Sequence, residues 1–258
     1  MVSVPPELGE LARTCVGPLF ARACESRAAG GLLCDPKAEE LAEQLEHDAA
    51  DLDWPMYQLL IGIRTEIIDE ATTAFLTRCP EGLVVDLGAG LDTRFERLDN
   101  GLVRWYELDL PPVIELRRRF FAEGDRHCTI PLSVLDVRWM EALPDDAPML
   151  FIMEGLANYL EERQARAVLG AIARRFPGAE VVMDALGLLW VRLMRNPMYR
   201  WGVCADNSPA QWHPQLKLVD SWYVLDRHPE RWRQFPWLWP LWPLRRNAQV
   251  IFHLRAEA

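Results

Sequence analysis

The chain has 258 residues, of which 50% are hydrophobic, and a formal net charge of −10. This length and apolar content are sufficient for a well-buried core, so the composition predicts a globular protein and excludes a disordered one. The acidic balance argues against nucleic acid as the main partner, because phosphate binding needs a basic face.

The chain has six cysteines, which form no Cys-x-x-Cys pair, and five histidines that do not cluster with them. This pattern predicts the reduced thiols of an intracellular protein and no metal site. The first residues show no signal-peptide pattern, and no apolar run approaches the ~18 residues that a membrane span requires. We therefore expect a cytoplasmic protein with no membrane partner; the sequence does not indicate its oligomeric state.

Residues 1–80 are expected to form a helical N-terminal part. Apolar residues recur at helical spacing over 8–15, and Asp35-Pro36 predicts a helix that begins with proline at its first position. A longer amphipathic helix is expected over residues 55–78.

Strand and helix patterns alternate after residue 82, which is typical of a parallel sheet with helices on both faces. The expected strands are 83–87, 102–108, 128–135, 148–153 and 180–186. The expected helices are 92–98, 111–122 and 161–175. Residues 216–225 and 248–255 complete a seven-stranded sheet, so we predict an α/β fold and a single domain over residues 1–258.

Residues 84–94 read Val-Val-Asp-Leu-Gly-Ala-Gly-Leu-Asp-Thr-Arg, an apolar run followed by a glycine-containing turn. A second apolar run ends in Asp109, and an acid at that distance is suited to accept from ribose hydroxyls. Thr93 stands where a dinucleotide-binding loop has its third glycine, and no Walker pattern is present. S-adenosylmethionine therefore fits better than NAD. An ordinary strand-to-helix turn and a nicotinamide oxidoreductase are the alternatives.

Three motifs resemble a known family: Gly-Leu-Asp-Thr-Arg at 90–94, Asp-Leu-Pro at 109–111, and Glu-Gly-Leu-Ala-Asn-Tyr-Leu at 154–160. They are similar to the leucine carboxyl methyltransferase family, and in particular to its bacterial branch of tetracenomycin-type polyketide O-methyltransferases. The resemblance covers roughly residues 20 to 185. It implies a class I, Rossmann-like fold with an antiparallel last strand, S-adenosylmethionine as cofactor, and methyl transfer to oxygen, often that of a carboxylate.

Acids follow four successive predicted strands, and the carboxyl ends of parallel strands meet in one crevice. We expect Asp109 to bind the ribose, Asp136 and the Val137 amide to bind the adenine, and Glu154 to face the ammonium or sulfonium. Asp109 and Asp136 as mere helix caps remain an alternative. The predicted cofactor-binding residues are Arg64, Gly88, Ala89, Gly90, Asp92, Thr93, Asp109, Leu110, Asp136, Val137 and Glu154.

Arg64 matches the position that the resemblance assigns to the carboxylate of the cofactor. A guanidinium offers a two-pronged grip on a carboxylate. The alternative is an arginine on the solvated face of the 55–78 helix.

Residues 187–247 hold eight of the eleven tryptophans and form a Trp-rich, substrate-side insertion. The region is a hydrophobic plug on the sheet, an aromatic wall over a flat apolar substrate, or a partner surface. The candidate substrate-binding residues are Arg192, Arg195, Arg200, Trp201 and Trp212. The candidate catalytic residues, none of them certain, are His213 and His228 as bases and Tyr159 as a pocket residue.

The expected function is O-methylation of a small, apolar, aromatic biosynthetic intermediate at a carboxylate or a hydroxyl. We slightly favour the carboxylate, because it is ionised at neutral pH and needs only an orienting cation. A protein or peptide carboxyl methyltransferase and a non-catalytic cofactor-binding interaction subunit are the alternatives.

Overall fold

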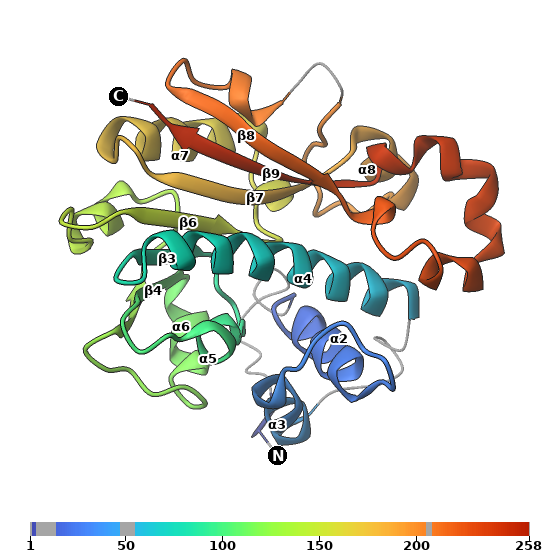
Figure 1. Cartoon of the computed structure of the whole chain (residues 1–258), viewed down its shortest axis with the longest axis horizontal. Helices are drawn as coiled ribbons and strands as arrows, with labels where there is room; N and C mark the ends of the chain where they lie inside the picture. The colour runs from blue at the N-terminus through green and yellow to red at the C-terminus, as the bar shows by residue number, and fades with distance from the viewer. Residues whose placement is uncertain (1, 4–13, 47–54, 205–207, 258) are drawn as a thin grey trace.

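The computed structural model describes residues 2–3, 14–46, 55–204 and 208–257. At its centre lies a seven-stranded sheet of order β5-β4-β3-β6-β7-β9-β8 (Figure 1). The strands are β3 (Leu83–Leu87), β4 (Arg104–Asp109), β5 (His127–Pro131), β6 (Met149–Met153), β7 (Glu180–Leu186), β8 (Leu216–Tyr223) and β9 (Gln249–Ala256). The strand order reverses between β3 and β6, and open α/β sheets bind ligands at such a point.

The expected α/β class and mostly parallel sheet are confirmed. Strands β3 to β7 run parallel, and β9 is antiparallel to both β7 and β8. β5 is shorter than predicted because the chain leaves the sheet at Pro131 and turns toward the 3-10 helix η3 (Val137–Ala142). β8 is an edge strand whose register shifts between Leu218 and Asp220, and such an irregularity hinders pairing with another chain.

The α-helices are α2 (Val16–Arg27), α3 (Pro36–Gln44), α4 (Pro55–Arg78), α5 (Arg94–Leu98), α6 (Pro111–Arg117), α7 (Glu162–Arg175) and α8 (Leu188–Met194). The predicted start at Asp35-Pro36 is correct, since the Asp35 side chain accepts from the Ala38 amide. Two short strands, β1 (Val2–Ser3) and β2 (Leu45–Glu46), pair in parallel. Most of the helical pattern expected over 8–15 lies outside the described residues.

Helices cover both faces of the sheet because its strands alternate their side chains. Leu83, Val85 and Leu87 pack in the cluster that contains the buried side of α7, whereas Val84 packs with α4 on the other face. A third apolar cluster joins α2, α3 and α6, and Figure 1 shows α2 and α3 side by side next to α4. Within the described ranges, no helix combines the length and apolarity needed to cross a membrane.

The Trp-rich region forms short 3-10 helices rather than a regular α-helix. They are η5 (Pro209–Gln211), η6 (Val224–Asp226), η7 (Arg231–Gln234) and η8 (Pro236–Asn247). Pro240 and Pro243 lie inside η8, where they lack the amide that an α-helix requires. Trp232 is fully buried in the cluster around α4, so part of this region packs against the sheet.

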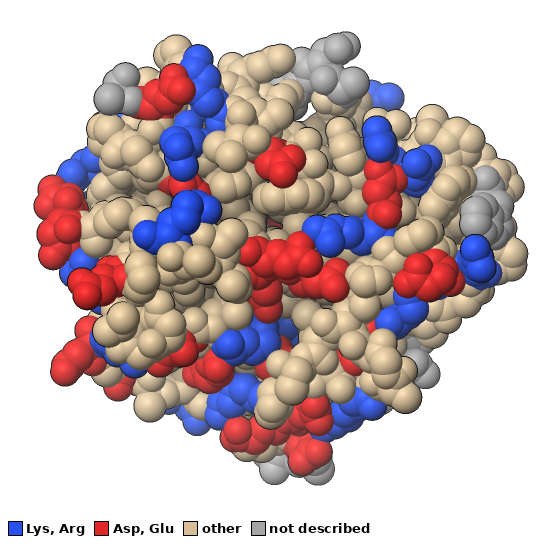
Figure 2. All heavy atoms as spheres, viewed as in Figure 1, with Lys and Arg blue, Asp and Glu red and all other residues tan. Residues whose placement is uncertain are grey.

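Figure 2 shows acidic and basic side chains interspersed over the face drawn, without a continuous basic surface there. This arrangement accords with the net charge of −10.

Candidate functional site

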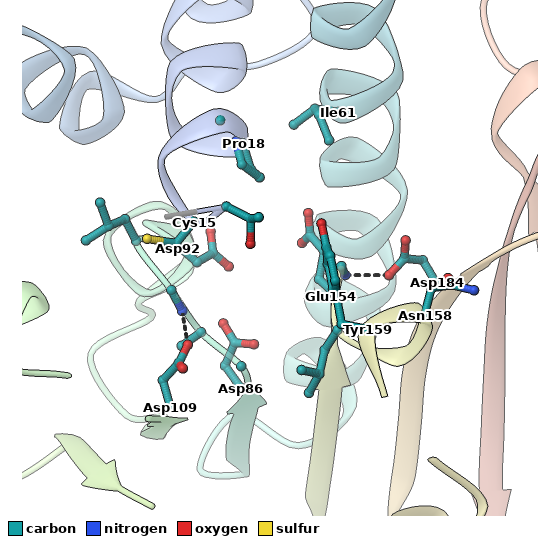
Figure 3. Close-up of a pocket in the computed structure, with 18 of the residues that line it drawn as sticks. Cys15, Pro18, Ile61, Asp86, Asp92, Asp109, Glu154, Asn158, Tyr159 and Asp184 are labelled. Carbon is teal, nitrogen blue, oxygen red and sulfur yellow. Dashed lines mark hydrogen bonds between the residues drawn. The ribbon is translucent and has the colours of Figure 1, made fainter. Parts of the chain in front are cut away.

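A cavity of about 790 Å³ opens at the carboxyl ends of β3, β4, β6 and β7, beneath α2 and α4. Its volume falls within the roughly 300–1,000 Å³ that is usual for small-molecule sites. Figure 3 shows Asp86, Asp92 and Asp109 on one side, and Glu154, Tyr159 and Asp184 on the other. The cavity therefore lies at the point where the strand order reverses.

The loop after β3 forms the floor of this cavity through glycines with positive φ. Gly88 has φ 76° and Gly90 has φ 53°, a region that other L-residues rarely adopt. A Cβ on Gly90 would lie only 2.8 Å from the Cβ of Cys15, at the start of α2. The glycines therefore let the loop turn tightly and let α2 pack directly over it.

Asp109 at the end of β4 holds this loop and faces the cavity. Its carboxylate accepts from the Gly90 amide at 2.8 Å and from the Leu110 amide at 2.6 Å. Burial raises the pKa of Asp109. Leu110, not Asp109, occupies the N-cap position of α6, so Asp109 is not merely a helix cap. Its remaining lone pairs are suited to accept from ligand hydroxyls.

Glu154, which follows β6, is held between two arginines. Arg64 Nε donates to Glu154 Oε1 at 2.8 Å, and Arg94 Nη2 donates to Oε2 at 2.5 Å. Burial opposes ionisation of Glu154, but the two guanidiniums hold its pKa below the usual value. Arg64 lines the cavity and also lies 3.5 Å from Asp184, so it is not an arginine on a solvated face.

Two further acids of the cavity have contrasting charge states. Asp92 is buried, but Arg94 and other arginines hold its pKa well below the usual range. For Asp86, on β3, burial and then repulsion from Asp92 raise the pKa well above the usual value. Sequence reasoning passed over Asp86, although a carboxyl inside a buried strand was a signal.

The charged side chains of the lining are mostly acidic. Its carboxyl groups outnumber its guanidiniums, and the latter are engaged: Arg22 pairs with Asp35, and Arg64 with Glu154. The charged lining residues are Asp86, Asp92, Asp109, Glu154 and Asp184, with Arg22 and Arg64. Such a lining suits a ligand with net positive charge.

The structure brings most of the predicted cofactor-binding residues together. Thr93, Asp136 and Val137 are the exceptions. Thr93 is not in the lining, and its hydroxyl donates to Asp35 at 2.6 Å. Asp136 caps η3 and pairs with Arg138, which lowers the pKa of Asp136 to about 2. The residues that line the cavity are Arg64, Gly88, Ala89, Gly90, Asp92, Asp109, Leu110 and Glu154.

Neither candidate histidine lies in the lining of the cavity. Arg174 donates to Nε2 of His213 at 3.2 Å, near α7. His228 Nε2 lies 2.8 Å from Glu66 on the far side of α4. Each histidine is held by a partner that belongs to a different part of the fold, so the structure does not position either one as a base for this cavity.

None of the candidate substrate residues lines the cavity, whereas Tyr159, the third candidate catalytic residue, does. Arg192, Arg195 and Arg200 are exposed. Trp201 is buried, and its Nε1 donates to the Ala157 carbonyl. The ring of Trp212 packs against that of Trp201, with 5.2 Å between the ring centroids. The chain from 187 folds back onto the sheet, so these aromatic rings serve packing; among the described residues, no tryptophan reaches the cavity.

Sequence reasoning missed several residues that do line the cavity. Tyr57, Tyr199 and Asp184 belong to α4, to the segment after α8 and to β7, and only the tertiary fold brings them together. Cys15 lies over the glycine loop, where burial raises its pKa to about 12. A thiol with that pKa is unreactive at neutral pH.

Comparisons with known proteins identify the family. A family model described as leucine carboxyl methyltransferase matches residues 15–173. The chain is similar to the tetracenomycin polyketide synthesis O-methyltransferase TcmP of Streptomyces glaucescens, with 31% identity over 224 residues and 83% of each chain covered. It is also similar to the S-adenosyl-L-methionine-dependent methyltransferase dpfgK of Gibberella zeae, with 27% identity over 191 residues, which cover 66% of this chain and 64% of the relative.

Two solved structures share the fold at low identity. A putative methyltransferase from Thermobifida fusca aligns with a TM-score of 0.58, 17% identity and 98% of each chain covered. A duf574 family protein from Streptomyces avermitilis aligns with a TM-score of 0.61 and 16% identity, over 92% of this chain and 96% of that one. The expected class I fold, cofactor and family are thus confirmed. The chain belongs to the leucine carboxyl methyltransferase family and is an S-adenosylmethionine-dependent methyltransferase.

Proposed function

We propose that the enzyme transfers the methyl group of S-adenosylmethionine to an oxygen of a small, apolar acceptor in the 790 Å³ cavity. The observation that carries this proposal is the acid-rich lining, in which Asp109 and the Arg64–Glu154 pair face one space. S-adenosylmethionine has a sulfonium, an ammonium and one carboxylate, so its net charge is positive and complements that lining.

The residues present fit the parts of this cofactor. Asp109 is placed to accept from the ribose hydroxyls, and Arg64 to bind the methionine carboxylate through the guanidinium nitrogens that Glu154 does not use. Glu154 and Asp86 would face the positive groups. Asp136 and Val137 remain proposed adenine contacts at the rim, next to the lining residue Leu135.

The cofactor supplies an electrophilic methyl group. In the transfer, a carbon–oxygen bond forms, the carbon–sulfur bond breaks, and sulfur keeps the electron pair and loses its positive charge. Alignment of the acceptor oxygen with that bond supplies much of the rate. Because no histidine of the described residues lines the cavity, the proton of a hydroxyl acceptor would pass to a buried carboxylate such as Asp184, whose pKa is raised by burial.

Transfer to oxygen and a small acceptor are supported by the relatives and by the lining. TcmP is described as an O-methyltransferase of polyketide synthesis. The cavity also has an apolar part, in which Leu60, Ile61, Leu186 and Met194 take part. This combination favours a small apolar molecule over a peptide terminus, which carries a polar backbone.

Calorimetry with S-adenosylmethionine and NAD tests the cofactor site. We expect S-adenosylmethionine to bind and Asp109→Ala to weaken binding about 10–100-fold, because a charged hydrogen bond contributes about 1.5–3 kcal/mol. Asp125→Ala, which removes an exposed carboxylate outside the cavity, is the matched control. Binding of NAD alone, or unchanged affinity in Asp109→Ala, would contradict the proposal.

The acceptor is sought with methyl-labelled cofactor and fractionated cell extract. Label in a small organic molecule, lost as a volatile product only under ester-cleaving base, would identify a carboxylate; base-stable label would identify an ether. Label recovered only in protein would contradict the small-acceptor proposal.

A further inference from the structure

Arg94, the last residue of the Gly-Leu-Asp-Thr-Arg motif, begins α5 and is buried just outside the lining of the cavity. It is 1% exposed and is not itself a lining residue. Its guanidinium donates to three carboxylates: Nε to Asp69 at 2.6 Å, Nη1 to Asp92, and Nη2 to Glu154 at 2.5 Å. Asp92 and Glu154 line the cavity from opposite sides (Figure 3), so Arg94 connects the two sides.

The orientation of Arg94 is fixed by Asp69 of α4, which is outside the lining. Asp69 also accepts from Arg97, at 2.9 Å from its Nε and at 3.1 Å from its Nη2. Arg97 in turn donates to Asp35, the N-cap residue of α3, at 2.7 Å. Because a guanidinium is planar, a carboxylate held at Nε sets the direction of both Nη groups. The pair of Asp69 and Arg97 therefore aims Arg94 at the two acids of the cavity.

Glu154 needs a second arginine because Arg64 is shared. Arg64 donates to Glu154 through Nε, and its Nη1 lies 3.5 Å from Asp184. It is also the proposed partner of the methionine carboxylate, so a bound cofactor would draw on the same guanidinium. The three contacts of Arg94 are all with the protein, and a ligand does not compete for them.

Glu154 also needs nearby positive charge to stay ionised in its buried position. Burial opposes ionisation of Glu154, whereas Arg64 and then Arg94 lower its pKa below the usual value. Loss of the Arg94 charge would therefore raise the pKa of Glu154. Besides Arg94, the titratable and charged groups that act on Glu154 are Arg22, Tyr57, Arg64, Asp86, Asp92 and Asp184.

We infer that Arg94 is a positioning residue, which holds the Glu154 carboxylate in place as the partner of the cofactor's ammonium without touching the cofactor itself. Attachment of α5 to the fold does not by itself account for Arg94, because Arg97 of the same helix already joins it to Asp69 and Asp35. The inference rests on the proposed function, which places a positive group of the cofactor beside Glu154. It adds to that function a residue outside the lining that sets the affinity.

Calorimetry with S-adenosylhomocysteine, which retains the ammonium group, tests the inference at pH 8 and pH 6. Arg94→Gln removes the charge, and we expect it to weaken binding about 10-fold at pH 8, the lower end of what a charged hydrogen bond contributes. The ratio of its Kd to that of the parent should grow at least about 3-fold further at pH 6, because Glu154 without this guanidinium is protonated at higher pH. A merely loosened site would not add this pH dependence.

Two further variants separate charge, geometry and stability. Arg94→Lys keeps the positive charge but lacks the planar fork. It should bind more weakly than the parent at both pH values but follow the pH dependence of the parent. Arg78→Gln is the matched control, because it removes an arginine that pairs with Glu180 outside the lining of the cavity. It should lower the melting temperature and leave the affinity unchanged.

Several outcomes would overturn the inference. Unchanged affinity in both Arg94 variants would do so, as would a ratio of Kd between Arg94→Gln and the parent that is the same at pH 8 and pH 6. If thermal melts show that Arg94→Gln fails to fold, Arg94→Lys decides, and an affinity equal to that of the parent would then overturn the inference. Failure of S-adenosylhomocysteine to bind the parent protein would contradict the proposed function instead, so the two failures are distinguishable.

Discussion

At the scale of a single residue, Asp86 shows how a ligand site costs stability. It is 2% exposed, and burial and the neighbouring Asp92 raise its pKa well above the usual value. Because the folded-state pKa exceeds the unfolded value of about 3.9, its stabilising contribution is complete below about pH 4 and is lost as pH rises through the folded pKa. At neutral pH, a cation beside Asp86 would offset this loss.

Asp86→Asn should therefore stabilise the ligand-free protein and weaken cofactor binding. The amide keeps the shape and removes the buried charge, so we expect a melting temperature about 2–4 °C higher at pH 8, and a smaller difference at pH 5. Affinity for S-adenosylmethionine should fall about 10-fold or more, because a charged partner of the ammonium is lost. Thermal melts at both pH values and calorimetry measure these effects. A lower melting temperature at pH 8, or unchanged affinity, would argue against this role.

At the scale of elements, Glu180 joins the end of α4 to two strands. Arg78 donates to it from the last turn of α4 at 2.8 Å, and His253 and Arg255 contact it from β9 at 2.8 and 2.7 Å. Burial opposes ionisation, but these partners lower the pKa of Glu180 to about 2. A depressed folded-state pKa contributes stability above the unfolded value of about 4.3, and this contribution is lost as pH falls toward 2.

Glu180→Gln should lower the free energy of unfolding by about 1–3 kcal/mol at pH 7, with a difference that shrinks below about pH 4. Urea unfolding at pH 7 and pH 3 measures it. Asp145→Asn, in an exposed pair with Arg175, should have little effect at either pH. Cofactor affinity should not change, because Glu180 begins β7, whereas the cavity lies at its carboxyl end. A difference independent of pH would show that the carboxylate charge is not responsible.

The elements could be predicted well because their signals are local. Glycine, proline and apolar runs mark strand ends directly, so β3, β6 and β7 form within a residue of the predicted ranges. Strand β5 ends earlier than predicted, because the chain turns toward η3, whose N-cap is Asp136. Neither α8 nor the 3-10 helices of the Trp-rich region were expected. In η8, the prolines exclude a regular α-helix without indicating the 3-10 helix that replaces it.

The site could be predicted only where strand ends define it. Asp109 and Glu154 follow strands, and the rule for parallel sheets brings them together. Tyr57 and Tyr199 lie in helix and loop segments whose orientation depends on tertiary packing, so no local pattern indicated them. His213 and His228 lie in the Trp-rich region but not in the lining of the cavity.

At the scale of the whole molecule, the cavity lies between parts of the fold with separate cores. The cluster of α2, α3 and α6 packs apart from the two clusters on the faces of the sheet. Arg22 of α2 joins that helix to the loop after β3 and to the start of α3, donating to the Leu91 carbonyl at 2.8 Å and to Asp35 at 3.3 Å. Residues 14–18 also line the cavity. A bound cofactor would therefore contact both parts and add to their attachment.

Cofactor binding should consequently protect α2 more than the distant edge of the sheet. S-adenosylmethionine at about 100 times its Kd adds about 2.7 kcal/mol to the free energy of unfolding. The free energy of any local opening that exposes the cavity rises by the same amount. Hydrogen exchange should slow in α2 and at the start of α4, and change little in β8, which pairs only with β9 at the far edge. Uniform slowing along the chain would mean that α2 opens only when the whole molecule unfolds. No slowing in α2 would mean that the cofactor does not contact it.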